Sequence, residues 1–90
     1  MINISDREDW TQIDSVMSNM DHEIDLDAED KLKADKVYSS YPAWNFYSWV
    51  WYEVGKFHCE IWTYGCYRET ITADSLQDIM DQASSKYGND

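Results

Sequence analysis

A chain of ninety residues is long enough for one domain and too short for two. Its eighteen acids and seven bases give a net charge of −11, which opposes compaction. That charge excludes direct binding to nucleic acid and disfavours an anionic membrane, because phosphate recognition needs clusters of Lys and Arg. Aromatic residues nevertheless make up 16% of the chain, a content that predicts a folded core.

The negative charge is concentrated in the first third of the chain. Residues 1–35 contain eleven acids and three bases, a net charge of −8, whereas residues 36–90 contain seven acids and four bases, a net charge of −3. A basic protein surface is the natural complement of such a field. The charge distribution therefore predicts a basic protein as the partner.

Targeting signals are absent from the sequence pattern. No apolar run approaches the roughly 20 residues of a membrane span, and the first residues have neither the basic nor the apolar region of a signal peptide. We therefore expect a cytoplasmic protein without a membrane partner. In that compartment Cys59 and Cys66 are expected to be free thiols.

Two helices are expected in the acidic third. Ser5 and Glu8 have the spacing of a capping box, and a helix over about residues 6–21 would bury one apolar stripe. Asp25 and the residues after it then suggest a break and a second helix over about 27–40, which Pro42 ends. The stripe of the first helix, extended to residue 24, consists of Trp10, Ile13, Val16, Met17, Met20 and Ile24.

From Trp44 onward the pattern favours β structure, because aromatic and β-branched residues dominate. Gly55-Lys56 can form a two-residue hairpin loop of the type II′ kind, with the second strand returning to about Thr63. A third strand over about 67–72 can follow a turn at Gly65. The sequence thus predicts an antiparallel hairpin or a three-stranded sheet.

The hairpin loop sets the register of its strands. With Gly55-Lys56 in the loop, Tyr52 lies opposite Cys59 and Val50 opposite Ile61, on a face that is expected to be core. The other face is aromatic, and it is either covered by a helix as a second core or exposed and used to form a homodimer. The aromatic residues of this face are Tyr47, Trp49, Trp51, Trp62 and Tyr64.

A C-terminal helix is expected over about residues 75–86. Asp74 and Gln77 have capping-box spacing, and Gly88 suits the C-cap. The expected fold is therefore a single acidic α+β domain over residues 1–90. It has two N-terminal helices, an antiparallel hairpin or three-stranded sheet, and a C-terminal helix.

Catalytic and metal-binding patterns are weak. Zinc sites favour four ligands with CxxC or HxxxH spacing, whereas Cys59 and Cys66 are seven residues apart and His58 points to the opposite side of a strand from Cys59. No nucleophile, base and orienting acid are tied together, and there is no Gly-rich phosphate loop. We therefore expect no enzyme activity, no metal and no cofactor.

The acids of the first third can serve as a presented surface. Asp14, Asp21 and Asp25 would align along one flank of the first expected helix. Duplex DNA carries one negative charge per roughly 1.7 Å of its axis, and carboxylates on two helices, doubled in a dimer, could approach that density. A charge run can equally be a solvated face, so DNA mimicry and a simple acidic surface both remain open.

The chain also resembles a known family. The stretch from Ser5 to Asp14 (SDREDWTQID), the acidic segment 21–35, the Trp- and Tyr-rich hairpin and the size are similar to small acidic early proteins of T-even-type phages. The family is that of the anti-restriction nuclease (Arn) proteins, which are DNA-mimic inhibitors. The resemblance implies protection of phage DNA from a host restriction enzyme of the McrBC type, through occupancy of its DNA-binding surface by the monomer or a homodimer. The carboxylates it implies as phosphate mimics are Asp14, Asp21, Glu23, Asp25, Asp27, Glu29, Asp30 and Asp35.

Two other functions are open from the residues alone. A small interaction module could bind through the aromatic sheet face, with acidity serving solubility. A metal or thiol redox protein could use His58, Cys59 and Cys66. Of the three, DNA mimicry is the function that the charge and the resemblance together favour.

Overall fold

The computed structural model describes residue 4, residues 7–13, residue 16, and residues 24–34, 36–40 and 47–87, with Tyr47 described by its backbone alone. Within these residues the chain forms a five-stranded mixed sheet and two helices. The fold belongs to the α+β class, but two parts of the expected fold are wrong. The pair of N-terminal helices is not formed, and in place of an antiparallel hairpin or three-stranded sheet the described residues form five strands that include a parallel pair. In chain order the elements are β1 (Thr11–Ile13), α1 (Leu26–Ala34), β2 (Val37–Ser40), β3 (Tyr47–Glu53), β4 (Lys56–Thr63), β5 (Cys66–Ala73) and α2 (Leu76–Tyr87).

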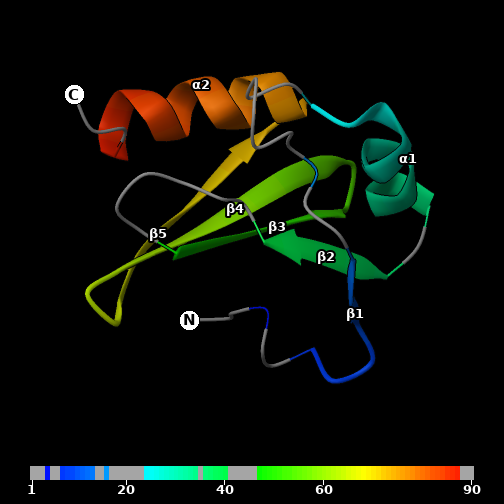
Figure 1. Cartoon of the computed structure of the whole chain (residues 1–90), viewed down its shortest axis with the longest axis horizontal. Coiled ribbons are helices and arrows are strands. Elements are labelled where there is room, and N and C mark those ends of the chain that lie inside the picture. The colour runs from blue at the N-terminus through cyan, green and yellow to red at the C-terminus, as the bar shows by residue number, and fades with distance from the viewer. Residues whose placement is uncertain are drawn as a thin grey trace.

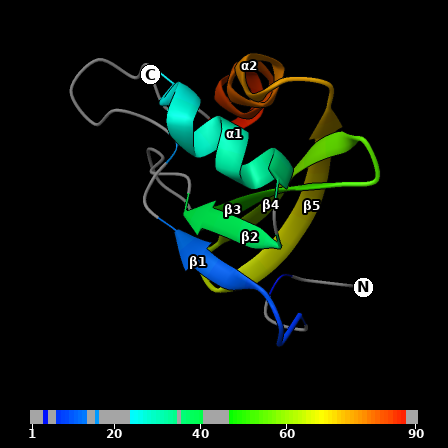
Figure 2. The same ribbon diagram turned by 90° about the vertical axis from the view of Figure 1, so that its right-hand side faces the viewer.

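The strands lie in the sheet in the order in which they occur in the chain (Figure 1). β1 pairs with β2 in parallel, and the remaining neighbours are antiparallel. The parallel pair is joined through α1, as a parallel connection requires a crossover, while β3, β4 and β5 follow one another through tight turns. Figure 2 shows that α1 and α2 cover the same face of the sheet.

The expected helix over residues 6–21 is contradicted by β1. The amide of Thr11 donates to the carbonyl of Lys36 at 3.1 Å, so this segment is held by β2. Ile13 packs against the core, whereas Trp10 lies beside the guanidinium of Arg7. Residues three apart lie on opposite faces of an extended chain. Trp10 and Ile13, whose spacing predicted one apolar stripe of a helix, therefore lie on different faces of the sheet. Met17 and Met20 of that stripe lie outside the described residues.

The expected helix over 27–40 is correct only in its first part. α1 ends at Ala34, and Val37–Ser40 is a strand in which Val37 and Ser39 are buried and the residues between and after them are half-buried. As a strand, this segment forms its backbone hydrogen bonds with β1 on one side and β3 on the other and so joins them in one sheet, which a further helical turn would not do. Tertiary pairing therefore overrides the weak helical period.

The β3–β4 turn contains Val54 and Gly55, not the predicted Gly55 and Lys56. Both turn residues have positive φ, 54° and 77°, as in a type I′ turn. Glu53 consequently lies opposite Lys56, and every predicted pair is shifted by two residues, so that Tyr52 faces Phe57. Because the shift is even, the predicted residues that lie within β3 and β4 keep their predicted faces although their partners were wrong.

The third strand and the C-terminal helix are confirmed as β5 and α2. The cap of α2 lies one residue later than expected, since the Ser75 hydroxyl accepts from the amide of Asp78 at 3.1 Å. The far end of α2 is held to β5, where Glu69 accepts a hydrogen bond from the Tyr87 hydroxyl and pairs with Lys86 at 3.0 Å. Gly88 lies outside the described residues.

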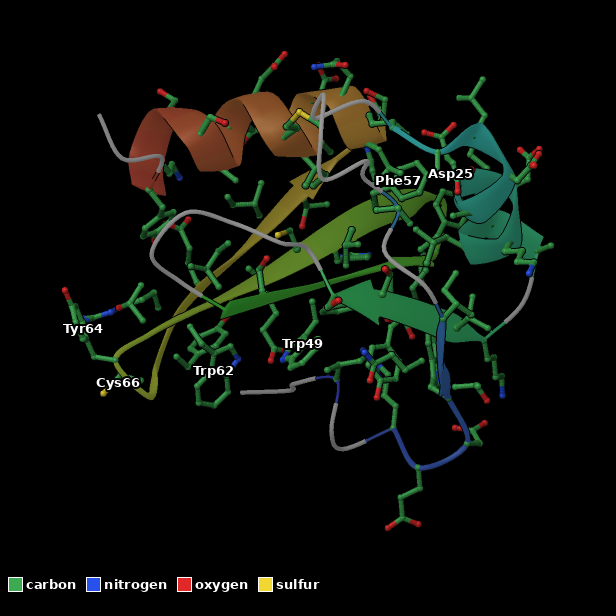
Figure 3. The ribbon with its side chains drawn as sticks, in the orientation of Figure 1. Asp25, Trp49, Phe57, Trp62, Tyr64 and Cys66 are labelled. Carbon is green, nitrogen blue, oxygen red and sulfur yellow. The ribbon has the colours of Figure 1, made fainter. Side chains whose placement is uncertain are left out.

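The main core lies between the helices and the sheet. Figure 3 shows Phe57 on this side, where its ring meets Tyr52 edge-on at 4.8 Å. Burial of these apolar side chains is the chief stabilising contribution in a chain this small. The core residues include Ala28 and Leu32 from α1, Val50, Phe57, Cys59, Ile61 and Ile71 from the sheet, and Leu76, Ile79, Met80 and Ala83 from α2.

Val54 offers a direct test of the turn. A β-branched residue at φ 54° is strained, and its side chain is 92% exposed, so nothing offsets the strain by burial. Val54→Asn should raise the free energy of unfolding by about 1 kcal/mol, because Asn tolerates this conformation. Thermal unfolding should show a midpoint about 4–8 °C higher. Val54→Thr keeps the β-branch and should leave the midpoint unchanged; an equal gain from both variants would contradict the strain.

Candidate functional site

The carboxylates named from the sequence fall into two groups. Four of them lie outside the described residues: Asp14, Asp21, Glu23 and Asp35. The other four lie together at the N-terminal half of α1 and immediately before it: Asp25, Asp27, Glu29 and Asp30. The structure therefore brings together one half of the predicted set.

Asp25 has a structural task in addition to its charge. Its Oδ1 accepts hydrogen bonds from the amides of Asp27 at 3.0 Å and Ala28 at 3.3 Å, which makes it the N-cap of α1 (Figure 3). Its own amide donates to the carbonyl of Val16 at 2.7 Å. The carboxylate is thus fixed in direction by the helix end, and a partner could reach only its remaining lone pairs.

Asp27 and Asp30 are the carboxylates of α1 best placed to meet a partner. Both are exposed, and the buried side of this helix is formed by Ala28 and Leu32. Glu29 is half-buried and lies 3.9 Å from Lys33, one turn along the helix. The free acidic edge of α1 therefore consists of Asp27 and Asp30.

The second helix adds acids that the sequence reasoning did not include. Asp78 and Asp81 of α2 are exposed, while Ile79 and Met80 point into the core. The amphipathic period of residues 76–87 was the available signal, since it already placed both acids on the outer side. Because α1 and α2 form one layer (Figures 1 and 2), their exposed acids belong to the same side of the molecule. We call Asp27, Asp30, Asp78 and Asp81 the helix-layer acids.

Basic side chains are largely engaged within the chain. At least five of the seven bases lie within 4 Å of a carboxylate, which reduces the positive charge that would repel a basic partner. At Asp9 the hydrogen bond from Lys36 lowers the pKa of the carboxyl group. The pairs are Arg7–Glu53 at 2.8 Å, Lys33–Glu29 at 3.9 Å, Lys36–Asp9 at 2.8 Å, Lys56–Asp74 at 2.5 Å and Lys86–Glu69 at 3.0 Å.

The aromatic residues named from the sequence lie mainly on the sheet face opposite the helices. Trp49 and Trp62 are half-buried there (Figure 3), and Trp51 is 3% exposed. Tyr64 is different, because it lies in the β4–β5 turn at φ 50° and is 93% exposed. The side chain of Tyr47 is not described, although its backbone pairs with Trp62. The two helices of the described residues lie on the other face, so neither covers these rings.

Glu60 lies among these rings and is the most informative residue that the sequence reasoning missed. It is 1% exposed, and its Oε1 accepts a hydrogen bond from the indole of Trp62 at 2.5 Å. Its Oε2 accepts from the amide of Ile4 at 2.9 Å. Glu60 therefore ties the N-terminal segment to the sheet. In the sequence, the one signal for Glu60 is that it lies between two core residues of a strand. Alternation then places it on the opposite face but does not predict that it is buried there.

The N-terminal segment continues across this face through Arg7. The guanidinium carbon of Arg7 lies 5.5 Å from the ring centroid of Trp10 and 5.7 Å from that of Trp51. The same group pairs with Glu53 at 2.8 Å. Trp51 thus has a cation from its own chain beside its ring.

The three residues of the metal or thiol hypothesis lie in different surroundings. Cys66 is exposed at the β4–β5 turn (Figure 3), whereas Cys59 points into the core. His58 lies on the aromatic face, where its ring stacks on that of Trp51 with the two centroids 5.4 Å apart. Within the described part of the chain, no three His, Cys, Asp or Glu side chains are grouped to hold a metal ion. In the same part of the chain, no helix is long and apolar enough to cross a bilayer.

Glu60 gives a test of the N-terminal attachment. Glu60→Gln leaves one acceptor for two buried donors, the amide of Ile4 and the indole of Trp62, and points an N–H group at one of them. The free energy of unfolding should fall by about 1–3 kcal/mol in urea titration. Glu8→Gln, the same change at an exposed position, is the control and should have no effect. Equal stability of both variants would show that Ile4 is not held by Glu60.

The two cysteines should differ sharply in reactivity. Burial raises the pKa of the Cys59 thiol to about 12, so almost no thiolate exists at pH 8. A thiol reagent should therefore modify one equivalent in the native protein, at exposed Cys66, and two after denaturation. Cys66→Ser should abolish the native reaction. Rapid modification of two thiols in the native protein would contradict the placement of Cys59 in the core.

Comparisons of the chain with known protein families, with curated proteins and with solved structures found no match. Function is therefore inferred from the two surfaces themselves, the acidic helix layer and the aromatic sheet face.

Proposed function

We propose that this protein is an inhibitor that binds a basic DNA-binding protein through exposed carboxylates and so keeps DNA from the same surface. The observation that carries the proposal is the acidic helix layer, with Asp27 and Asp30 on α1 and Asp78 and Asp81 on α2. A net charge of −11 supports it, because the long-range field attracts a basic partner.

Carboxylates can take the place of phosphates at the partner's surface. An arginine that binds a phosphate through two parallel hydrogen bonds can bind a carboxylate in the same way. Asp27 and Asp30 are three residues apart on a helix and therefore project from the same side of it. A protein that presents several such acids would compete with DNA without catalysis, metal or cofactor.

The resemblance to the Arn family gives this proposal a specific target. The target is a host restriction enzyme of the McrBC type, met by a phage-encoded protein in the host cytoplasm. Two copies would double the acidic surface, so a homodimer belongs to the proposal as its extended form.

Neutralising the α1 acids should weaken inhibition. Asp27→Asn with Asp30→Asn should raise the concentration needed for half-inhibition of DNA cleavage by a purified McrBC-type enzyme about tenfold, or roughly 1.4 kcal/mol. Both side chains are exposed, so the fold should persist. Cleavage of modified-cytosine DNA is the measurement, repeated at rising salt, where inhibition should weaken steeply.

The matched control is Asp27→Glu with Asp30→Glu, which keeps the charge and should inhibit as the native protein does. Raising the DNA concentration should relieve inhibition. If inhibition is independent of DNA concentration and of salt, the protein does not act by occupying the DNA-binding surface.

A second candidate is a small interaction module that binds through the aromatic face. The observation in its favour is that Trp49 and Trp62 remain half-buried on the face opposite both described helices. Trp49→Ala or Trp62→Ala would then abolish partner binding, whereas neutral α1 variants would bind normally. Under DNA mimicry the two sets of variants give the reverse result.

A further inference from the structure

A cation-binding arrangement lies on the aromatic face, away from the helix-layer acids. Its parts are the ring of Trp51 and the carboxylate of Glu53, both on β3. The indole of Trp51 donates to Oε1 of Glu53 at 3.2 Å, and this same oxygen pairs with Arg7. The ring and the acid therefore converge on one point, which the guanidinium of Arg7 occupies.

The sheet positions the ring of Trp51 and the backbone of Glu53 through contacts that do not involve Arg7. His58 of β4 stacks on Trp51 with 18° between the ring planes, and its Nε2 lies 3.0 Å from the carbonyl oxygen of Glu53. Trp51 and His58 are also directly paired across the two strands. Arg7 and Trp10, by contrast, come from the segment before β1. The receiving groups are thus part of the sheet, and the occupant belongs to a separate segment.

The fit between Arg7 and this arrangement is incomplete. Its Nε is buried and has no hydrogen-bond partner among the residues that the structure describes, whereas Nη2 makes the contact with Glu53. A buried donor without an acceptor opposes the bound state. A guanidinium that arrives from another direction can use two N–H groups on the carboxylate and still lie against the indole.

We propose that Trp51 and Glu53 form a guanidinium-binding site that Arg7 occupies in the free protein and that an arginine of a protein partner takes over. Arginine suits the site better than lysine, since its planar group both stacks on an aromatic ring and pairs with a carboxylate through two donors. Arg7 competes as part of the same chain, at a high effective concentration, so a free arginine binds weakly to the native protein. The proposal is independent of the helix-layer acids, which lie on the opposite side of the sheet.

Removal of Arg7 should open the site. Arg7→Ala should bind N-acetyl-argininamide with a dissociation constant at least about tenfold lower than that of the native protein. The readout is the NMR resonance of the Trp51 indole N–H, assigned by its loss in Trp51→Phe. This proton reports the site directly, because it is donated to Glu53. N-acetyl-lysinamide should bind more weakly to the same variant.

Two control variants separate this site from general charge attraction. Arg7→Ala combined with Glu53→Gln should lose the gain, because the carboxylate is gone. Arg68→Ala removes an exposed arginine of β5 and should bind the probe as the native protein does. Equal gains in the Arg7 and Arg68 variants, equal binding of the arginine and lysine probes, or persistence of the gain without Glu53 would each overturn the proposal.

The native protein provides a test that does not depend on how a variant folds. Its Trp51 indole resonance should shift saturably with N-acetyl-argininamide at high millimolar concentration and should not do so with the lysine probe. Absence of a saturable shift in the native protein and in Arg7→Ala would overturn the proposal. None of these measurements involves a restriction enzyme, so their failure is distinct from failure of DNA mimicry.

Discussion

The alternation of side chains along β4 is the constraint on which the rest of the structure depends. Phe57, Cys59 and Ile61 point toward the helices and are fully buried, while His58, Glu60 and Trp62 point to the other face. Because β4 is the central partner of both β3 and β5, its alternation decides the faces of the whole hairpin unit. The alternation of side chains along β4 therefore determines both which residues form the core under the helices and which form the aromatic face. A one-residue slip would move Glu60 into the apolar core and Phe57 out of it.

The two faces also differ in how their carboxylates are treated: some on the aromatic face are buried or half-buried, whereas those of the helix layer are exposed. Glu60 is buried among aromatic rings, which is tolerated because an indole and a backbone amide donate to its two oxygens. Glu53 is half-buried and satisfied by Arg7 and by the indole of Trp51. The helix-layer acids are exposed at the surface, and of these Asp81 accepts a hydrogen bond from the side-chain amide of Gln77 at 3.1 Å. A chain with a net charge of −11 thus uses some carboxylates as internal hydrogen-bond acceptors and leaves others at the surface, where mutual repulsion is screened by water and salt.

The sequence predicts those parts of the fold in which local signals and tertiary pairing agree. α2 has a cap, an apolar period and a length that all indicate a helix, and β5 is marked by the turn at Gly65. The segment around Trp10 and Ile13 has helical spacing, but its partner strand β2 lies more than twenty residues later, and no local signal announces that pairing. The Val54-Gly55 turn was missed because a β-branched residue is disfavoured at positive φ. Of the candidate surfaces, the aromatic face follows from alternation alone, whereas the contact of Arg7 with Trp51 and Glu53 depends on where a distant segment lies.

The two surfaces would act on a partner through different physics. The helix-layer acids attract a partner at a distance, so they raise the rate of encounter. Their attraction is largely screened beyond a Debye length, which is roughly 10 Å at 0.1 M salt. The site at Trp51 and Glu53 is partly enclosed and depends on stacking and directed hydrogen bonds, which salt weakens far less. Since the surfaces lie on opposite sides of one sheet, a single partner domain cannot cover both without wrapping around the edge of the molecule (Figure 2). If high salt slows association but leaves the dissociation rate unchanged, binding through the aromatic face is indicated. If high salt both slows association and speeds dissociation, binding through the helix layer is indicated.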